Sequence, residues 1–209
     1  PHQGSPNAAG MAVPEAFLTK WLGSDIVDHY TYALVGDGCL QEGIGQEVIS
    51  LAGHLRLGKL VFLWDDNRMT DDGGIEIALS DDILARFRLS NWHVQEIDGH
   101  DMEAVSAAIL LAKKDPRPSM ICCTTIIGRG LPGVEGTRAA HSGRIQRQLG
   151  DAARRYLDWP HPRFEIPEDI LSAWRDAGRR SAPEYQAWTS PVAALSPDTR
   201  GLLDRLRGG

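Results

Sequence analysis

The sequence predicts an α/β protein built on a doubly wound parallel sheet with helices on both faces. Short apolar runs that suit buried strands alternate along the chain with segments of helical periodicity. Glycine and polar residues follow at the points where the first of these apolar runs end. In open parallel sheets ligands bind at such carboxyl ends of strands, so the same pattern predicts where a site would lie.

The first half of the chain predicts a helix followed by a strand–helix–strand unit. A helix is expected over residues 7–22, and a glycine-ended strand then leads to a second helix that begins near Gln41. Four apolar residues with helical spacing are expected to form the buried face of this second helix: Val48, Leu51, Ala52 and Leu55. The apolar run 60–64 has the pattern of a strand buried on both faces, so residues 31–65 are predicted to form a βαβ unit.

The alternation continues through the middle of the chain. The expected elements are a short helix up to Leu89, a strand over residues 92–97, a helix up to Lys113 and a strand over residues 119–127. Asp81 or Asp82 is expected to cap the first of these helices and Asp101 the second, because an N-cap carboxylate accepts hydrogen bonds from unpaired backbone N–H groups. The polar, glycine-bearing residues 66–80 are predicted to form a loop.

The composition changes near residue 150. Residues 1–150 are predicted to form one domain with a hydrophobic core, which a chain of 209 residues is long enough to build. Residues 128–144 are expected to be a glycine-rich loop within this domain. Farther along, prolines separate short segments of helical pattern, so residues 151–209 are predicted to be a helical connector or tail without site residues.

Charge and composition exclude several classes of protein. The chain has 22 basic and 28 acidic residues, a formal net charge of −6, and no basic stripe that would neutralise nucleic-acid phosphates. No apolar run approaches the length of a membrane span. The adjacent Cys122 and Cys123 and the separate Cys39 do not form a disulfide pattern, which favours reduced thiols and a cytoplasmic location. Packing beside the glycines is favoured over a nucleophilic role for Cys39.

A short polar motif follows each of the first two predicted strands. Gly36-Asp37-Gly38 ends the first strand and Asn67 follows the second, with residues 39 to 66 between the two parts. This arrangement resembles the bipartite signature of thiamine-diphosphate enzymes, which bind the cofactor's diphosphate through Mg²⁺. Most isolated Gly-Asp-Gly tripeptides are turns, but the βαβ context favours a binding site over a turn.

The resemblance implies a definite set of ligands. Mg²⁺ takes oxygen ligands in a near-octahedral shell, and Asp37 would give a carboxylate, Asn67 an amide oxygen and Met69 a backbone carbonyl. Phosphate oxygens and water would complete the shell. Gly36 and Gly38 would let the backbone approach the phosphates without an intervening Cβ, and the N–H groups at the start of the next helix would face the same anion.

Several further blocks resemble one family, transketolase. They occur in the family's order and comprise residues 25–32, 36–43, 65–67, 92–94, 97–101, 125–128 and 164–168. The resemblance covers nearly the whole chain and implies the thiamine diphosphate-binding fold, with thiamine diphosphate and Mg²⁺ as cofactors. It corresponds only to the first half of a full-length transketolase, which is the part that holds the diphosphate.

A loop after the last predicted strand departs from the family pattern. Family members carry two histidines there; His141 matches the second, while Arg138 stands in place of the first, which reaches the cofactor phosphates and the donor substrate. Arg138 would keep anion binding but not acid–base chemistry, because a guanidinium stays protonated. Proton transfer is then left to His141, to a partner group or to water, and His141 is the catalytic candidate in this chain. The alternative for Arg138 is a solvent-facing loop residue. A second departure is at residues 68 and 69, where the family usually has a small residue and then Ile. Arg68 is expected to add a charge at the rim of the diphosphate site, and Met69 can still offer its main-chain carbonyl.

The resemblance also implies a partner. The second half of a transketolase, which holds the aminopyrimidine ring and supplies an activating glutamate, is absent from this sequence. Family residues that precede Pro1 are absent as well, so we expect a trimmed piece rather than a natural start. The predicted function is the N-terminal subunit of a split transketolase. Such an enzyme transfers a two-carbon ketol unit, glycolaldehyde, from a ketose phosphate to an acceptor, as a heterotetramer with a pyrimidine-binding second subunit.

Two alternatives stay open. The first is a divergent transketolase-like subunit of a specialised biosynthetic pathway that delivers the two-carbon unit to an unusual acceptor, such as a carrier-protein thiol; the exchange at Arg138 favours it. The second is a non-catalytic binding or regulatory module that keeps the cofactor fold. The presence of both Asp37 and Asn67 argues against this module.

Overall fold

The structure is a computed structural model that describes residues 3–142 and 145–206. Its contacts divide the chain into two compact units. The sheet unit consists of Pro1–Ala16 and His29–Trp159, and the helical unit consists of Phe17–Asp28 and Pro160–Gly209. The boundary that the sequence predicts, between residues 1–150 and 151–209, stays a prediction.

Four parallel strands form the sheet, in the order β1-β2-β4-β3. They are β1 (Thr31–Gly36), β2 (Leu60–Asp66), β3 (His93–Asp98) and β4 (Ser119–Thr124). The register pairs Gly36 of β1 with Asp65 of β2, so these two strands end level with each other. The predicted α/β class with a parallel sheet is confirmed.

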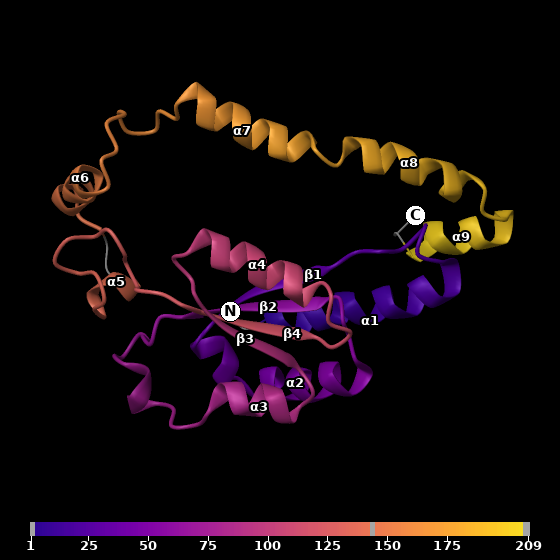
Figure 1. Cartoon of the computed structure of the whole chain (residues 1–209), viewed down its shortest axis with the longest axis horizontal. Helices are drawn as coiled ribbons and strands as arrows, with labels where there is room; N and C mark the ends of the chain where they lie inside the picture. Colours follow the sequence, from indigo (N-terminus) through magenta and orange to yellow (C-terminus); the bar gives the residue numbers. More distant parts are fainter. Residues whose placement is uncertain (1–2, 143–144, 207–209) are drawn as a thin grey trace. The chain divides into compact units, whose positions relative to one another are not determined.

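Helices cover both faces of this sheet. The helical segments that begin in the sheet unit are α1 (Gly4–Leu22), which continues into the helical unit, η1 (Gly38–Gln41), α2 (Gly43–Leu55), η2 (Ile75–Ile77), α3 (Ile83–Leu89), α4 (Met102–Ala112), α5 (Ala139–Ser142) and α6 (Arg147–Tyr156). Figure 1 shows α2 and α3 on one face and α4 on the other. The strand order explains why α4 lies on the opposite face from α2 and α3. Parallel crossovers are right-handed, so a connection that reverses direction along the sheet places its helix on the other face. The connection from β3 back to β4 runs in the opposite direction to the two earlier connections.

The face under α2 and α3 carries the larger core. Trp92 packs against Phe62 and Phe87, with ring centroids 5.0 and 4.9 Å apart. Its indole Nε1 donates to the carbonyl of Ile49 in α2 at 2.8 Å, so the ring is both buried and hydrogen-bonded. Small residues of α1 join the same cluster: Ala8, Ala9 and Ala12. This aromatic group anchors α2 and α3 to the sheet.

The face under α4 carries a smaller core, formed by Val61, Ala108, Ala112, Ile121 and Cys123. The predicted cap of α4 is confirmed, since the carboxylate of Asp101 accepts from two backbone N–H groups at 2.9 and 3.1 Å. On β1 this face is left uncovered, and Leu34 is 84% exposed. Parallel sheets are normally covered on both faces, so β1 presents apolar surface for a further contact.

The buried face of α2 differs from the prediction. Leu51 and Leu55 are 47% and 45% exposed. The residues of α2 that are buried are Gly45, Val48, Ile49, Ala52 and Gly53. A close approach is the cause, because a Cβ on Gly53 would fall on the backbone carbonyl of Ser90, in the turn between α3 and β3. Small residues therefore face the turn, and the two leucines face outward.

The helical unit contains α7 (Glu168–Arg179), α8 (Ala182–Ala193) and α9 (Pro197–Leu206). The indole of Trp188 in α8 donates to the carbonyl of Ile26 at 2.9 Å, which joins the two segments of this unit. Neither α7 nor α8 has a buried residue. None of the described helices is both long enough and apolar enough to cross a lipid bilayer.

Candidate functional site

Asp37 lies directly after β1 and is buried, with 3% of its surface exposed. Its Oδ1 accepts a hydrogen bond from the indole Nε1 of Trp64 at 3.0 Å. Its Oδ2 is also buried but has no hydrogen-bond partner among the described residues. Because nearly all buried polar atoms in proteins have a partner, this bare carboxylate oxygen favours a bound ligand, and a cation suits it best.

The surroundings of Asp37 raise its pKa to about 6. Burial is the largest cause. The hydrogen bond from Trp64 acts in the opposite direction, as does one from the backbone N–H of Met69, whereas the charges of Asp66 and Asp65 raise the pKa further. A divalent cation would reverse this balance, because it stabilises the ionised carboxylate.

Asn67 and Met69 lie beside Asp37. The Oδ1 of Asn67 accepts from the backbone N–H of Met69 at 3.0 Å, and the same N–H group is near enough to Asp37 to lower its pKa. Asp65 holds the other end of the Asn67 amide, whose Nδ2 donates to Asp65 Oδ2 at 3.0 Å. The structure thus brings together the three residues that the sequence nominates as metal ligands.

The loop after Asn67 folds back on itself. Arg68 has a φ of 60°, in the left-handed region that few residues other than glycine adopt. Its carbonyl accepts from the N–H of Ile75 at 3.1 Å, and Met69 pairs with Gly74 in an isolated antiparallel bridge. These contacts fix the backbone on both sides of Met69.

Gly36 and Gly38 flank Asp37. Neither has a positive φ, so the backbone conformation does not require glycine at either position. No described heavy atom lies within 4 Å of the place that a Cβ would occupy on either residue. Open space beside a buried carboxylate supports the approach of a ligand, and it weakens the alternative that the motif is only a turn.

A turn separates Asp37 from the helix that the sequence predicts from near Gln41. The 3-10 turn η1 comes first, and α2 begins only at Gly43. The side chain of Gln46 donates back to the carbonyl of Leu40 at 2.5 Å, which ties the turn to α2. The N–H groups nearest Asp37 therefore belong to a short turn, whose dipole is smaller than that of a full helix.

Arg138 and His141 meet the loop that follows Asn67. The Nε of Arg138 donates to the backbone carbonyl of Asp71 at 2.6 Å. The Nδ1 of His141 lies 3.4 Å from Oδ1 of the same Asp71, within ion-pair distance. The glycine-rich loop is thereby held against the loop that carries the candidate metal ligands.

The sequence and the fold of this chain both match those of one known protein family. The sequence matches the family described as transketolase, thiamine diphosphate binding domain, over residues 2–205. The chain belongs to this transketolase family. A transketolase of Cereibacter sphaeroides is 47% identical to it over 192 residues, which make up 92% of this chain and 29% of that protein. The predicted resemblance to transketolase is confirmed.

Solved transketolases have the same fold. The crystal structure from Campylobacter jejuni subsp. jejuni matches with a TM-score of 0.91 at 31% identity, covering 98% of this chain and 32% of that one. A Pichia stipitis transketolase in complex with sedoheptulose 7-phosphate matches with a TM-score of 0.88 at 32% identity, covering 95% and 31%. The chain thus spans about a third of the length of its transketolase relatives.

The residues of this transketolase domain fit a metal that is bound together with a diphosphate. In residues 3–142 and 145–206 no group of three or more His, Cys, Asp or Glu side chains is arranged to hold a metal ion. One carboxylate, one amide and one backbone carbonyl supply only part of an octahedral shell. A metal at Asp37 would therefore need oxygen atoms from a second ligand, and a diphosphate provides them.

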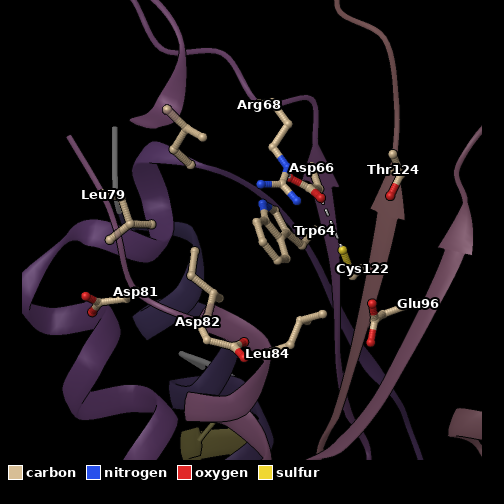
Figure 2. A pocket seen from close by; sticks show the side chains of 12 residues that line it. Trp64, Asp66, Arg68, Leu79, Asp81, Asp82, Leu84, Glu96, Cys122 and Thr124 are labelled. Atoms are coloured by element: carbon tan, nitrogen blue, oxygen red, sulfur yellow. Dashed lines mark hydrogen bonds and ion pairs between the residues drawn. The ribbon is translucent and has the colours of Figure 1, made fainter. Parts of the chain in front are cut away.

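A cavity of about 310 Å³ lies beside the loop after β2 that carries the candidate ligands Asn67 and Met69, which we call the metal-ligand loop. Figure 2 shows Trp64, Asp66 and Arg68 together on its wall. The Nε of Arg68 lies 3.0 Å from Oδ1 of the buried Asp66, an ion pair without hydrogen-bond geometry, and the Cys122 thiol donates to Oδ2 at 3.6 Å. Burial, with the nearby Asp66, raises the pKa of Cys122 to about 12, so the thiol stays protonated. Arg68, which the sequence predicts to add a charge at the rim of the diphosphate site, forms this ion pair with Asp66, and its role at the rim stays a prediction.

Figure 2 also shows Asp81, Asp82 and Glu96, three further acidic residues that line this cavity. Each of them has a structural partner. Asp81 forms an ion pair with Arg86. Glu96 forms one with Arg88 at 2.6 Å, and Asp82 is the cap of α3. Of the two caps that the sequence proposes for α3, Asp82 is the correct one. The acidic residues on the cavity wall therefore have structural roles in the fold of the transketolase domain.

Sequence reasoning misses the residues that hold the candidate ligands in place. Trp64 donates to Asp37, and Asp65 accepts from both Asn67 and the hydroxyl of Thr125. A signal for Trp64 exists in the sequence, since an indole N–H at the end of a buried strand needs an acceptor. No local signal marks the contact with Thr125, which lies 60 residues farther along the chain.

Proposed function

We propose that the chain is the diphosphate-binding subunit of a transketolase, which transfers a two-carbon ketol unit from a ketose phosphate to an acceptor. One observation carries the proposal: in a transketolase domain, Asp37 keeps a buried carboxylate oxygen without a partner, beside Asn67. Burying a bare carboxylate destabilises a fold, so a domain that had lost its cofactor would have no reason to keep it.

The proposed cofactors are thiamine diphosphate and Mg²⁺. Asp37, Asn67 and the backbone carbonyl of Met69 would hold the metal, with oxygen atoms of the diphosphate as further ligands. When bound, thiamine diphosphate supplies the nucleophilic carbon and the electron sink that cleavage of a ketose carbon–carbon bond requires. The chain contributes orientation, since Trp64 fixes the carboxylate of Asp37 and Asp65 fixes the amide of Asn67.

Arg138 and His141 are assigned to the rim of this site. Arg138 has a permanent charge and five N–H donors, of which Nε is used on Asp71, so its terminal nitrogens suit the oxygens of a phosphate. His141 brings an imidazole to the rim, and the two ring nitrogens of this side chain can donate and accept protons. We assign anion binding to Arg138 and proton transfer with the substrate oxygens to His141.

A second polypeptide with a pyrimidine-binding domain is the proposed partner, in a heterotetramer of two such pairs. The chain spans 29% of the Cereibacter sphaeroides relative and 32% of the Campylobacter jejuni one. An apolar cavity of about 510 Å³ is lined by residues of β1, β2 and α4, among them Leu34, Leu63 and Met102. Leu34 and Met102 are 84% and 72% exposed. Exposed apolar surface next to the site supports burial against a further part of the enzyme.

Sugar phosphates are the proposed substrates. The Pichia stipitis neighbour is described in complex with sedoheptulose 7-phosphate, and the guanidinium of Arg138 suits a phosphorylated ligand. A cytoplasmic location is proposed from the cysteines, because Cys39, Cys122 and Cys123 are all free.

A divergent activity is the second candidate. In it the two-carbon unit goes to an unusual acceptor such as a carrier-protein thiol. Arg138 favours this candidate, because a guanidinium in place of the family histidine changes the acid–base chemistry at the rim. Ketol transfer to sugar phosphates is preferred, since Gly36-Asp37-Gly38 and Asn67 match the family.

Reconstituted activity tests the proposal. The chain is combined with the pyrimidine-binding remainder of a transketolase, Mg²⁺ and thiamine diphosphate, and transfer from a ketose phosphate to an aldose phosphate is followed. We expect transfer only when both polypeptides are present. It should be lost with Asp37→Ala and kept with Asp72→Ala, which removes an exposed carboxylate of the neighbouring loop. Donor cleavage without transfer to any sugar phosphate would support the divergent acceptor instead.

Arg138→Ala should weaken binding of the phosphorylated donor or the cofactor by about 1.5–3 kcal/mol, the usual contribution of hydrogen bonds to a charged group. Arg138→His should support more sugar-phosphate transfer than Arg138→Ala, because it puts the family histidine back at this position. Arg129→Ala is the matched control, because it removes the same charge from the same loop. Both steps are scored separately in the reconstituted enzyme. If Arg138→Ala leaves cofactor affinity, donor cleavage and transfer at wild-type values, Arg138 is only a surface residue and the divergent candidate loses its main support.

A further inference from the structure

Two loops of the site are joined at two places. Near their base, the N–H of Thr125 donates to the carbonyl of Asp66 at 3.1 Å. Farther along, both Arg138 and His141 contact Asp71. The loop after β4 therefore closes on the loop after β2, and Asp71 is the residue where their outer parts meet.

Asp71 offers a different group to each partner. Its backbone carbonyl accepts from Nε of Arg138 at 2.6 Å, whereas its carboxylate lies 3.4 Å from Nδ1 of His141. A substitution of the Asp71 side chain therefore removes the contact with His141 and leaves the acceptor for Arg138 in place. The two contacts can be tested independently of each other.

The Asp71 carboxylate influences which ring nitrogen of His141 carries the proton. In a neutral imidazole one nitrogen is a donor and the other an acceptor, and the partner of one decides the role of the other. Nδ1 lies 3.4 Å from Oδ1 of Asp71 without hydrogen-bond geometry, and the negative charge of the carboxylate favours the form that has its proton on Nδ1 and leaves Nε2 as an acceptor. The side chains of His141 and Asp71 are 38% and 70% exposed, so the pair adds little to the stability of the fold. Its effect is on the orientation and tautomer of the ring.

We propose that Asp71 is a positioning residue, which holds Arg138 and His141 against the metal-ligand loop and presents Nε2 of His141 as the nitrogen that accepts a proton. The proposal rests on the proposed function, in which His141 performs proton transfer. In this role Asp71 acts through its contact with His141. Carboxylates orient imidazole rings in the same way at other histidine sites.

Histidine NMR on the chain tests this role without metal, cofactor or partner. In the neutral ring, the two nitrogen shifts distinguish the Nδ1–H form from the Nε2–H form. Asp71→Ala is compared with Asp72→Ala, because Asp72 is the adjacent residue and is also exposed, so each variant removes one carboxylate from the same turn. A His141→Gln variant identifies the signal of His141, and Asp71→Glu tests whether a restored carboxylate restores the signal.

The wild-type chain, Asp72→Ala and Asp71→Glu should show mainly the Nδ1–H form of His141. Asp71→Ala should shift the population several-fold toward the Nε2–H form, while the Nε–H of Arg138 should exchange at the wild-type rate, because its acceptor is a backbone atom. Equal tautomer populations in Asp71→Ala and Asp72→Ala would overturn the proposal.

Failure of this proposal is distinguishable from failure of the proposed function. If Asp71→Ala leaves the tautomer unchanged but cofactor binding depends on Asp37, the transketolase function stands and the positioning role of Asp71 falls. If the tautomer shifts but cofactor binding does not depend on Asp37, Asp71 still orients His141, and the assignment of the metal site is the part that fails.

Discussion

Asp37→Ala should abolish measurable binding of thiamine diphosphate with Mg²⁺ by the chain combined with its pyrimidine-binding partner. The variant removes the single carboxylate among the proposed metal ligands and the buried oxygen that has no partner of its own. Isothermal calorimetry on the assembled enzyme measures the loss. Asp72→Ala, which also removes one carboxylate but from an exposed position, should bind like the wild type. Unchanged affinity in Asp37→Ala would remove the metal assignment.

The isosteric Asp37→Asn should increase the stability of the metal-free chain, although Asp37 is required for binding. A carboxyl group whose pKa is raised from 3.8 to about 6 binds its proton more tightly in the folded state. The metal-free chain therefore loses stability as the pH rises from about 4 to about 6, and above this range the ionised Asp37 costs on the order of 3 kcal/mol. Asp37→Asn avoids this cost and can keep an acceptor for Trp64.

Thermal unfolding of the metal-free chain as a function of pH measures this effect. At neutral pH Asp37→Asn should melt above the wild type, and the difference should disappear below about pH 4, where Asp37 is protonated in both the folded and the unfolded chain. A residue that lowers stability but is required for binding is typical of a functional site. Equal melting of the two proteins at neutral pH would show that Asp37 is not held as a bare, buried carboxylate.

Gly53→Ala should destabilise the sheet unit by about 3 kcal/mol, at the upper end of overpacking costs. The added Cβ would fall on the carbonyl oxygen of Ser90, 2.9 Å from its carbon and 3.4 Å from the Trp92 ring. Backbone cannot rotate away as a flexible side chain can, so α2 must shift from the turn before β3. Glycine-to-alanine changes inside helices normally stabilise by about 0.5–1 kcal/mol, so the sign of the effect is diagnostic.

Gly43→Ala is the matched control for this prediction. Gly43 lies in the same helix, and a Cβ there would have no described heavy atom within 4 Å. Chemical denaturation should therefore show Gly43→Ala as neutral or slightly stabilised and Gly53→Ala as strongly destabilised. If both variants unfold at the same denaturant concentration, the close packing of α2 against the Ser90 turn is wrong.

The sheet and its helices follow from local patterns in the sequence. Apolar runs such as residues 60–64 predict buried strands, and carboxylates such as Asp82 and Asp101 mark helix starts, because both signals lie within a few residues. The buried face of α2 does not follow in this way. Counting apolar residues selects Leu51 and Leu55, whereas the close approach at Gly53 turns both leucines outward.

The residues of the candidate site also differ in whether local sequence patterns predict them. Asp37 and Asn67 can be found from the sequence because each directly follows a strand, and adjacent parallel strands end at one edge of the sheet. Asp71 cannot be found in this way. Its contact with Arg138 joins residues 67 positions apart through two irregular loops, where neither periodicity nor register predicts which residues meet.

Anomalous diffraction tests most directly whether Asp37, Asn67 and the carbonyl of Met69 hold a divalent cation together with thiamine diphosphate. Mn²⁺ accepts the same oxygen ligands as Mg²⁺ and can be located by its anomalous signal. Crystals of the assembled enzyme with Mn²⁺ and thiamine diphosphate should give a peak at the carboxyl ends of β1 and β2, within bonding distance of Asp37 and Asn67. Bound thiamine diphosphate without a peak at Asp37, or a peak at another group of residues, would contradict the assignment.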